Sequence, residues 1–283
     1  MPIIHAIVLG LVQGLSEFLP ISSSGHLLLV PWLLGWNDFA GPDGDSIKKT
    51  FDVALHLGTL VAVLGYFRHE VVTYVREGTL LVVNRRRPAT VDGKLAWYFV
   101  LATIPAAAVG ALFESAIDER LGTPTIIAVS LIVFGVLLGW ADRMAGRREL
   151  ERFGPRDALI VGAAQALALN PGTSRSGITI TGARALGFDR DSAARISFVM
   201  SLPVIAGAVL FKTYGAITDG IPSDLYWPMV VGIATSCVSG LAAVWGTLRL
   251  IRTRSFMPFV AYRIAAGVLV LVLIATGVRD ASI

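Results

Sequence analysis

The stretch QGLSEFLPISSSGH, residues 13–26, lies between two apolar segments and still carries a carboxamide, a carboxylate, four hydroxyls and an imidazole. Gln13 and Glu17 are four residues apart, so on a helix both side chains lie on one face and can reach the same cation or donor. Pro20 ends that helix, and the serines after it free backbone N–H groups, as anion-binding turns do. Polar groups at bilayer depth are costly, so the stretch predicts a functional site.

A second stretch repeats this pattern in the other half of the chain. Residues 13–25 and 165–177 have the same length, and both begin with glutamine and end in Ser-x-Ser-Gly. Each has an apolar helix, a proline break, a hydroxyl-rich turn and a second apolar helix. We interpret the two as a duplicated, broken helical hairpin, covering residues 2–34 and 157–187, that enters the membrane and returns.

The composition indicates an integral membrane protein. Of the 283 residues, 54% are hydrophobic and only 16% are charged, and the mean hydropathy is +0.69. A soluble domain carries more charge, and several apolar runs are long enough to cross a bilayer. We therefore expect an all-α, polytopic protein with six full spans in addition to the two re-entrant hairpins. The expected spans are residues 52–67, 95–113, 124–140, 194–211, 225–248 and 256–277.

The distribution of arginine predicts how the chain is oriented. Three basic loops are expected in the cytoplasm by the positive-inside rule: 68–94, 141–156 and 249–254. Three loops with more acidic than basic residues are expected outside: 35–50, 114–123 and 212–224. The hairpins then enter from opposite faces, so the single membrane domain, 1–283, divides into inverted repeats 1–140 and 141–283 whose hairpin tips meet near the midplane. Basic loops of this kind also explain the net charge of +4 without nucleic-acid binding.

Arg175 is the most informative residue of the second hairpin. It lies between Ser174 and Ser176, after a Pro-Gly break and before a helix. A guanidinium fork, hydroxyls and helix N-terminal N–H groups together make a phosphate site. The alternative is a structural arginine that pairs with Glu17.

The first hairpin offers a metal pair and several candidate catalytic groups. Gln13 and Glu17 suit a hard cation with oxygen ligands, Mg²⁺ or Ca²⁺, if substrate oxygens and waters complete the coordination; alternatively Glu17 only neutralises Arg175. His26 has the chemistry of a nucleophile, general base or proton donor, or of a hydrogen-bonded structural histidine. Spacing does not rank Ser22, Ser23 and Ser24, each of which could also cap a helix, although Ser23 is central.

Three other residues are expected to lack a chemical role. His56 is expected to be structural. Leu169 stands in the second copy where Glu17 stands in the first, so that copy has lost the metal pair. Cys237 is the single cysteine, which excludes an internal disulfide and a thiolate metal site.

Together the two motifs resemble the undecaprenyl pyrophosphate phosphatase family, integral membrane enzymes associated with bacitracin resistance. The family pattern Glu/Gln-x-x-x-Glu, followed by Pro-x-Ser-Ser-x-Gly-His, stands here within residues 13–26. Its Pro-Gly-x-Ser-Arg-Ser-Gly-x-Thr stretch stands at residues 171–179. Further similar segments extend the resemblance over nearly the whole chain.

The resemblance implies hydrolysis of undecaprenyl pyrophosphate to undecaprenyl phosphate and inorganic phosphate, which recycles the lipid carrier for peptidoglycan and other envelope polymers. It implies dependence on Mg²⁺ or Ca²⁺, a homodimer, and a place among the lipids of the bacterial inner membrane with the site open to the outer side. By motif match, Gln13 and Glu17 are expected to bind the metal. The catalytic residues are expected to be His26 and Ser23, with Glu17 and Arg175. The phosphate-binding residues are expected to be Ser22, Ser24, Ser174, Arg175, Ser176 and Thr179.

A second class of function stays open on the residues alone. An inverted repeat with broken helices is also typical of secondary transporters. In a transporter, Glu17 and His26 would form a proton-coupled pair and Arg175 would bind an anionic substrate; a lipid flippase is a related alternative. Phosphate release by detergent-solubilised protein separates catalysis from transport, because no compartments exist there.

Overall fold

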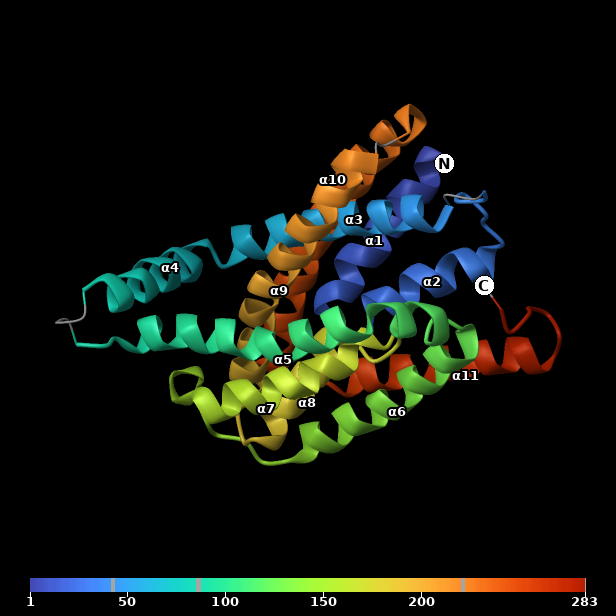
Figure 1. Cartoon of the computed structure of the whole chain (residues 1–283). Coiled ribbons are helices and arrows are strands. Elements are labelled where there is room, and N and C mark those ends of the chain that lie inside the picture. Colours follow the sequence, from blue (N-terminus) through green and yellow to red (C-terminus); the bar gives the residue numbers. More distant parts are fainter. Residues whose placement is uncertain (42–43, 85–87, 220–221, 283) are drawn as a thin grey trace.

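The computed structural model describes residues 1–41, 44–84, 88–219 and 222–282, without the side chains of 114–120 and 211–219. Arginines 85–87 of the predicted loop 68–94 therefore lie outside the described residues. The described secondary structure is helical, as predicted (Figure 1). The helices are α1 Ile3–Phe18, α2 Ser23–Leu34, α3 Gly44–Tyr66, α4 Arg68–Val83, α5 Val91–Arg120, α6 Pro124–Arg143, α7 Pro155–Ala166, α8 Arg175–Ala185, α9 Arg190–Asp219, α10 Tyr226–Ile251 and α11 Met257–Ala275, with 3₁₀ turns at Leu150–Arg152, Leu167–Leu169 and Ser223–Leu225.

Several described helices have the length and apolarity of membrane spans. Five segments qualify on their own: Val91–Phe113, Pro124–Arg143, Arg190–Leu210, Ser223–Ile251 and Met257–Ala275. The sixth expected span, 52–67, needs correction: it is part of α3, which begins at Gly44 and qualifies only together with α4, to which it is bent by 84°. An all-α, polytopic membrane protein is confirmed, and the inverted orientation of residues 1–140 and 141–283 stays a prediction.

Several helices extend into segments that were expected to be loops. Residues 114–120 belong to α5, beyond a kink at Phe113, whose φ of −127° and ψ of 15° are not helical. Residues 212–219 belong to α9, and α4 fills most of the expected loop 68–94. A charged residue costs a helix at most about 0.7 kcal/mol relative to alanine, so it does not by itself end one.

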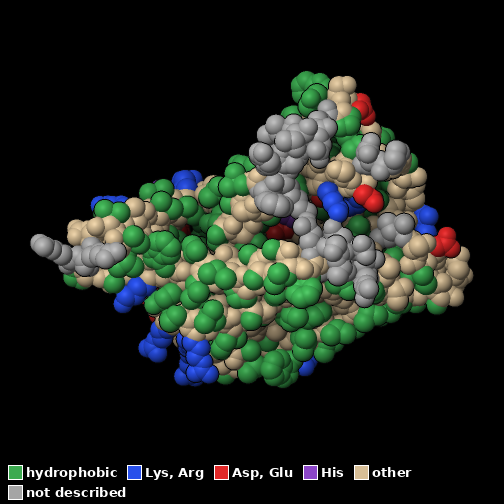
Figure 2. Space-filling model, viewed as in Figure 1, with side chains coloured by type: hydrophobic (Ala, Val, Ile, Leu, Met, Phe, Trp, Pro, Cys, Tyr) green, Lys and Arg blue, Asp and Glu red, His purple; other side chains and the backbone are tan. Residues whose placement is uncertain are grey.

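The surface of the molecule fits a lipid environment. Hydrophobic side chains cover most of the face shown in Figure 2, and Lys and Arg gather mainly toward its left and lower left margin. Large exposed residues such as Leu112, Leu210 and Trp227 are more than 70% accessible. Apolar exposure of this extent is a liability in water and is expected for helices that face lipid.

Each re-entrant hairpin consists of two short helices around a turn. In Figure 1, α1 and α2 (blue) form one pair, and α7 and α8 (yellow) form the other. None of these four helices, at 16, 12, 12 and 11 residues, reaches the about 20 residues that a span needs. Each helix is thus too short to cross a bilayer alone, and the re-entrant course of both hairpins stays a prediction.

The two turns share an unusual backbone conformation. Ser22 and Ser174 have φ values of 81° and 73°, and they are the non-glycine residues with positive φ in the described part of the chain. Each is an N-cap: its hydroxyl accepts from the N–H of the glycine three residues on, Gly25 or Gly177. The repeat detected in the sequence is thus repeated in the backbone.

The tips of the two hairpins touch. The Gly172 N–H donates to Ser22 Oγ at 3.0 Å, and Ser176 Oγ donates to the Leu19 carbonyl at 3.1 Å. A Cβ atom on Gly25 would lie 3.1 Å from the Gly172 nitrogen, so the two backbones are in close contact. This contact brings polar groups from positions 150 residues apart into one site.

Small residues let α1 pack closely on α10. An added Cβ on Gly14 would lie 2.0 Å from Ser239 Oγ and 2.4 Å from the Ser236 carbonyl oxygen. A Cβ atom added to Gly10 would likewise lie 2.0 Å from Thr235 Oγ1. This close packing fixes the position of α1 relative to α10, and therefore also the position of the last turn of α1.

We predict that Gly14→Val destabilises the protein. The added side chain must displace the α10 backbone, and overpacking of this kind costs about 1–3 kcal/mol or more. Thermal melting in detergent measures the effect. Gly246→Val, on α10 with open space around its Cβ, is the matched control and is expected to be neutral or stabilising. Equal melting temperatures for both variants would contradict the close packing.

Candidate functional site

The carboxylate of Glu17 is the centre of the site. It is 5% exposed, and its Oε1 accepts from Arg175 Nη2 at 3.1 Å. Its Oε2 accepts from Ser23 Oγ at 2.6 Å and from Gln13 Nε2 at 3.0 Å. His56 Nε2 lies 3.6 Å from the same oxygen. Four helices, α1, α2, α3 and α8, thus direct side chains at one carboxylate.

Local sequence explains why Glu17 and Ser23 meet. The residue before a proline avoids the helical region, and Leu19 accordingly has a ψ of 136° and ends α1. Glu17 therefore sits in the last turn of α1. The Ser22 cap starts α2, which makes Ser23 its first residue. The expected pairing of Gln13 and Glu17 on one helical face is present as a hydrogen bond.

Arg175 is held by groups from α8 and α9. Its Nη1 donates to the Ser197 carbonyl at 3.1 Å. Thr179 Oγ1 donates to the Arg175 carbonyl and to Ser197 Oγ, both at 2.8 Å. The buried Arg175 Nε–H has no hydrogen-bond partner among the described residues, so the guanidinium keeps this donor for a ligand.

The predicted phosphate-binding hydroxyls differ in how accessible they are. Ser24 is exposed, and the neighbouring Ser23, which is predicted to be catalytic, is partly exposed. Four others are buried and bonded to protein groups, so in this structure they hold the turns together: Ser22, Ser174, Ser176 and Thr179. Contact between these residues and a phosphate group stays a prediction.

His26 lies in the same region but contacts other partners. Its Nδ1 is 2.7 Å from the Ser22 carbonyl, and its Nε2 is 2.8 Å from the Tyr262 hydroxyl. A carbonyl only accepts, so Nδ1 carries the proton and Nε2 accepts from Tyr262. Both ring nitrogens are therefore engaged, and the histidine braces the turn that carries Ser22.

Four residues of the site region have no assigned role from the sequence. His56, expected to be structural, donates from Nδ1 to the Asp52 carbonyl and turns Nε2 toward Glu17. Tyr262 contacts His26, Ser197 contacts Arg175, and Arg263 contacts the backbone of both turns. An ionisable residue inside an apolar helix is itself a signal of function, and both His56 and Arg263 carry that signal. No local pattern marks Tyr262 or Ser197.

The side chains near Glu17 form only part of a metal site. Among the described residues, no three His, Cys, Asp or Glu side chains converge as a metal cage. Gln13 Oε1 is buried and has no hydrogen-bond partner in the described part of the chain, so it is an available oxygen donor beside the Glu17 carboxylate. Oxygen donors of this kind suit Mg²⁺ or Ca²⁺, and the remaining ligands would come from a bound anion and water.

The second copy of the motif has no such centre. Gln165, the counterpart of Gln13, is buried, and neither of its amide atoms bonds to any residue that the structure describes. Leu169 lies in a 3₁₀ turn where the first copy has Glu17. The site is thus asymmetric: the first hairpin supplies the carboxylate and the second supplies the guanidinium.

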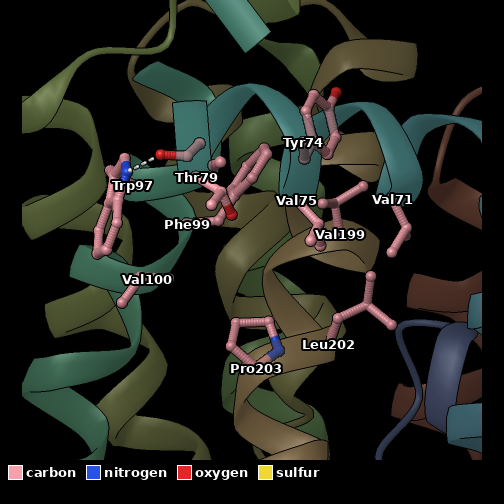
Figure 3. Close-up of a pocket in the computed structure, with 12 residues that line it drawn as sticks. Val71, Tyr74, Val75, Thr79, Trp97, Phe99, Val100, Val199, Leu202 and Pro203 are labelled. Carbon is pink, nitrogen blue, oxygen red and sulfur yellow. Dashed lines mark hydrogen bonds between the residues drawn. The ribbon is translucent and has the colours of Figure 1, made fainter. Parts of the chain in front are cut away.

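An apolar pocket of about 310 Å³ lies elsewhere, between α4, α5 and α9. Figure 3 shows Val71 and Tyr74 of α4, Phe99 of α5, and Leu202 and Pro203 of α9 around it. Its walls carry no charged side chain. Its lining residues include none of the side chains that bond to Glu17.

Comparison with known proteins gives a consistent result. Residues 6–269 match the family model described as bacitracin resistance protein BacA. An undecaprenyl-diphosphatase from Pelobacter propionicus is 45% identical over 280 residues, which cover 98% of this chain and 99% of the relative. One from Geobacter sulfurreducens is 46% identical over 269 residues, which cover 94% and 96%.

We predict that the Glu17–Arg175 pair is strongly coupled in stability. Replacing one partner leaves the other charge buried, which costs about 3–5 kcal/mol, whereas replacing both removes the uncompensated charge. Glu17→Leu and Arg175→Met are each expected to lower the free energy of unfolding in detergent. The sum of these two losses is expected to exceed the loss in the double variant. A double-mutant cycle measures this coupling, and strictly additive losses would show that the pair does not interact.

Proposed function

Because the chain belongs to the bacitracin resistance protein BacA family, we propose that it is an undecaprenyl-diphosphatase. It hydrolyses undecaprenyl pyrophosphate to undecaprenyl phosphate and inorganic phosphate, and so recycles the lipid carrier for cell-envelope polymers. Curated relatives of that name match it over almost their whole length. The observation that carries the proposal is the hydrogen bond of 2.6 Å from Ser23 Oγ to Glu17, beside the Arg175 guanidinium.

Ser23 and Glu17 have the geometry of a nucleophile and its base. A serine hydroxyl is a weak nucleophile until a neighbouring base takes its proton. In the first step Ser23 Oγ forms a bond to the terminal phosphorus, its proton passes to Glu17, and the bridging P–O bond breaks to release the prenyl phosphate. Water then cleaves the phosphoserine and releases inorganic phosphate. His26 is less suited to attack, because both its ring nitrogens are engaged.

Positive groups surround the place where the phosphoryl group would react. Arg175 keeps its Nε–H free, and α2 and α8 both begin at the site. Helix N-termini carry unpaired N–H groups and a partial positive charge, which favour an anion. Fixed donors of this kind stabilise the charge of the transferring phosphoryl group, which is the main task in phosphoryl transfer.

We further propose that Mg²⁺ or Ca²⁺ assists the reaction. Gln13 Oε1 and the Glu17 carboxylate would hold the ion together with diphosphate oxygens. The bound ion would neutralise charge on the diphosphate. Diphosphate oxygens would be needed as ligands, because the described side chains beside Glu17 form only part of a coordination shell.

The protein is an integral membrane protein, and we propose that it lies in the bacterial inner membrane with the site open to the outer side. The basic loops at 68–94, 141–156 and 249–254 support this orientation. The family resemblance also supports a homodimer. The relatives are named as phosphatases, and no contact in the site favours a transporter or flippase.

We predict that the purified protein releases phosphate from undecaprenyl pyrophosphate in detergent, and that Ser23→Ala lowers turnover by about 10³-fold or more, as loss of a nucleophile does. A colorimetric phosphate assay measures turnover. Ser16→Ala is the matched control, because the hydroxyl of Ser16 donates to the Val12 carbonyl of its own helix and to no other described residue. A folded wild-type protein without turnover in Mg²⁺ or Ca²⁺ would refute the proposed activity, and a fully active Ser23→Ala variant would exclude Ser23 as the nucleophile.

We predict that chelation abolishes turnover and that Mg²⁺ or Ca²⁺ restores it. Gln13→Glu adds a charged oxygen ligand and is expected to lower the metal concentration for half-maximal activity, whereas Gln13→Leu is expected to raise it. Gln165→Leu, at the counterpart in the second hairpin, should leave that concentration unchanged. The proposed metal role of Gln13 fails if all three variants respond to metal like the wild type.

A further inference from the structure

Arg263 of α11 is a fully buried arginine, and its hydrogen-bond partners among the described residues are all backbone carbonyls. It is 0% exposed. Nε donates to the Leu131 carbonyl at 3.1 Å, and Nη1 donates to the Pro20 carbonyl at 3.0 Å. Nη2 donates to the carbonyls of Gly172 at 2.8 Å and Thr173 at 2.9 Å, with a longer contact to Ser130 at 3.4 Å. One side chain thus bonds to both re-entrant turns and to α6.

The carbonyls that Arg263 holds lie close in sequence to the reacting groups. Pro20 precedes Ser23 by three residues in the first turn. Thr173 precedes Arg175 by two residues in the second. A shift of either carbonyl therefore displaces either the hydroxyl that attacks or the guanidinium that receives the charge.

Two glycines leave room for the side chain of Arg263. A Cβ on Gly177 would lie 2.8 Å from Arg263 Nη1, and one on Gly135 would lie 3.2 Å from the Arg263 Cβ. Glycine at both positions leaves room for the side chain between α6 and α8. A planar fork with five N–H donors matches several carbonyls at fixed angles, and a lysine ammonium does not.

The hairpins also contact each other directly. Glu17 bonds to Arg175, and Ser176 bonds to the Leu19 carbonyl. Each of these contacts joins one residue of one hairpin to one residue of the other. Arg263 adds a connection in which a single side chain holds backbone carbonyls of both turns, from a helix that belongs to neither hairpin.

We propose that Arg263 is a positioning residue for the reaction. It sets the distance and tilt between the two turns, so that Ser23 of one hairpin and Arg175 of the other face the same phosphoryl group. The proposal rests on the proposed phosphatase function of this site. Misplacement of reacting groups by about 1 Å can cost about 10²-fold in rate, which is the scale of effect expected.

A matched control exists in the same protein. Arg184 is 3% exposed and also donates to carbonyls, those of Asp142, Met144 and Phe188. It lies in the last turn of α8, away from the site residues at the start of that helix. Loss of Arg184 removes a buried arginine of the same kind without releasing either re-entrant turn.

The experiment compares Arg263→Ala, Arg263→Lys and Arg184→Ala with the wild type in detergent. Turnover per folded molecule, with kcat and KM separated, is measured with and without added guanidinium. Hydrogen exchange of residues 19–25 and 171–177 reports the backbone of the turns independently of turnover. Arg263→Lys keeps the positive charge, so it tests the role of the guanidinium if the alanine variant does not fold.

We expect Arg263→Ala to lower kcat by about 10²-fold, guanidinium to restore part of the loss, and both turns to exchange faster together. Arg263→Lys should fall between alanine and the wild type. Arg184→Ala should keep its kcat and show no response to guanidinium. Wild-type kcat in the folded Arg263 variants, or a loss without rescue and with unchanged exchange, would overturn the positioning role. A wild-type protein without turnover would instead refute the phosphatase function, and faster exchange of both turns in Arg263→Ala would still support the backbone connection.

Discussion

A carboxylate buried where two broken helices meet governs the arrangement of this protein. Glu17 is 5% exposed, and a lone charge in so dry a place is too costly to persist. Its counter-charge, Arg175, comes from a residue 158 positions away, and its remaining oxygen accepts from Ser23 and Gln13. The halves of the chain must therefore dock for the charge to be tolerated, and docking also assembles the groups that the chemistry needs.

Backbone strain appears at the same place. Ser22 and Ser174 both adopt positive φ, which costs of order 1–3 kcal/mol for each residue with a side chain. Their hydroxyls offset part of this cost by capping α2 and α8, and Ser22 also binds the opposite turn. The conformation points the N-termini of two helices toward one site. Strain, capping and anion attraction are thus consequences of a single turn geometry used twice.

The duplicated geometry nevertheless serves different chemistry in each copy. The first hairpin contributes an acid, a hydroxyl and a carboxamide, and the second contributes a guanidinium. Gln165 and Leu169 show that the second copy lacks an acid–amide pair. A site for a diphosphate gains from this division, because the base and the charge-stabilising group approach the phosphoryl group from different directions.

The sequence alone determined the features that depend on local pattern. Apolar content predicted a helical membrane protein, the spacing of Gln13 and Glu17 predicted their contact, and the repeated Ser-x-Ser-Gly motif predicted paired turns. Tertiary structure decided which residues complete the site: Tyr262 meets His26 across 236 positions, and Arg263 reaches Pro20 across 243. It also decided that α3 begins at Gly44 and bends into α4, and that His56 faces Glu17. Helical periodicity assigns a residue to a face of its own helix, but packing against other helices determines what that face contacts.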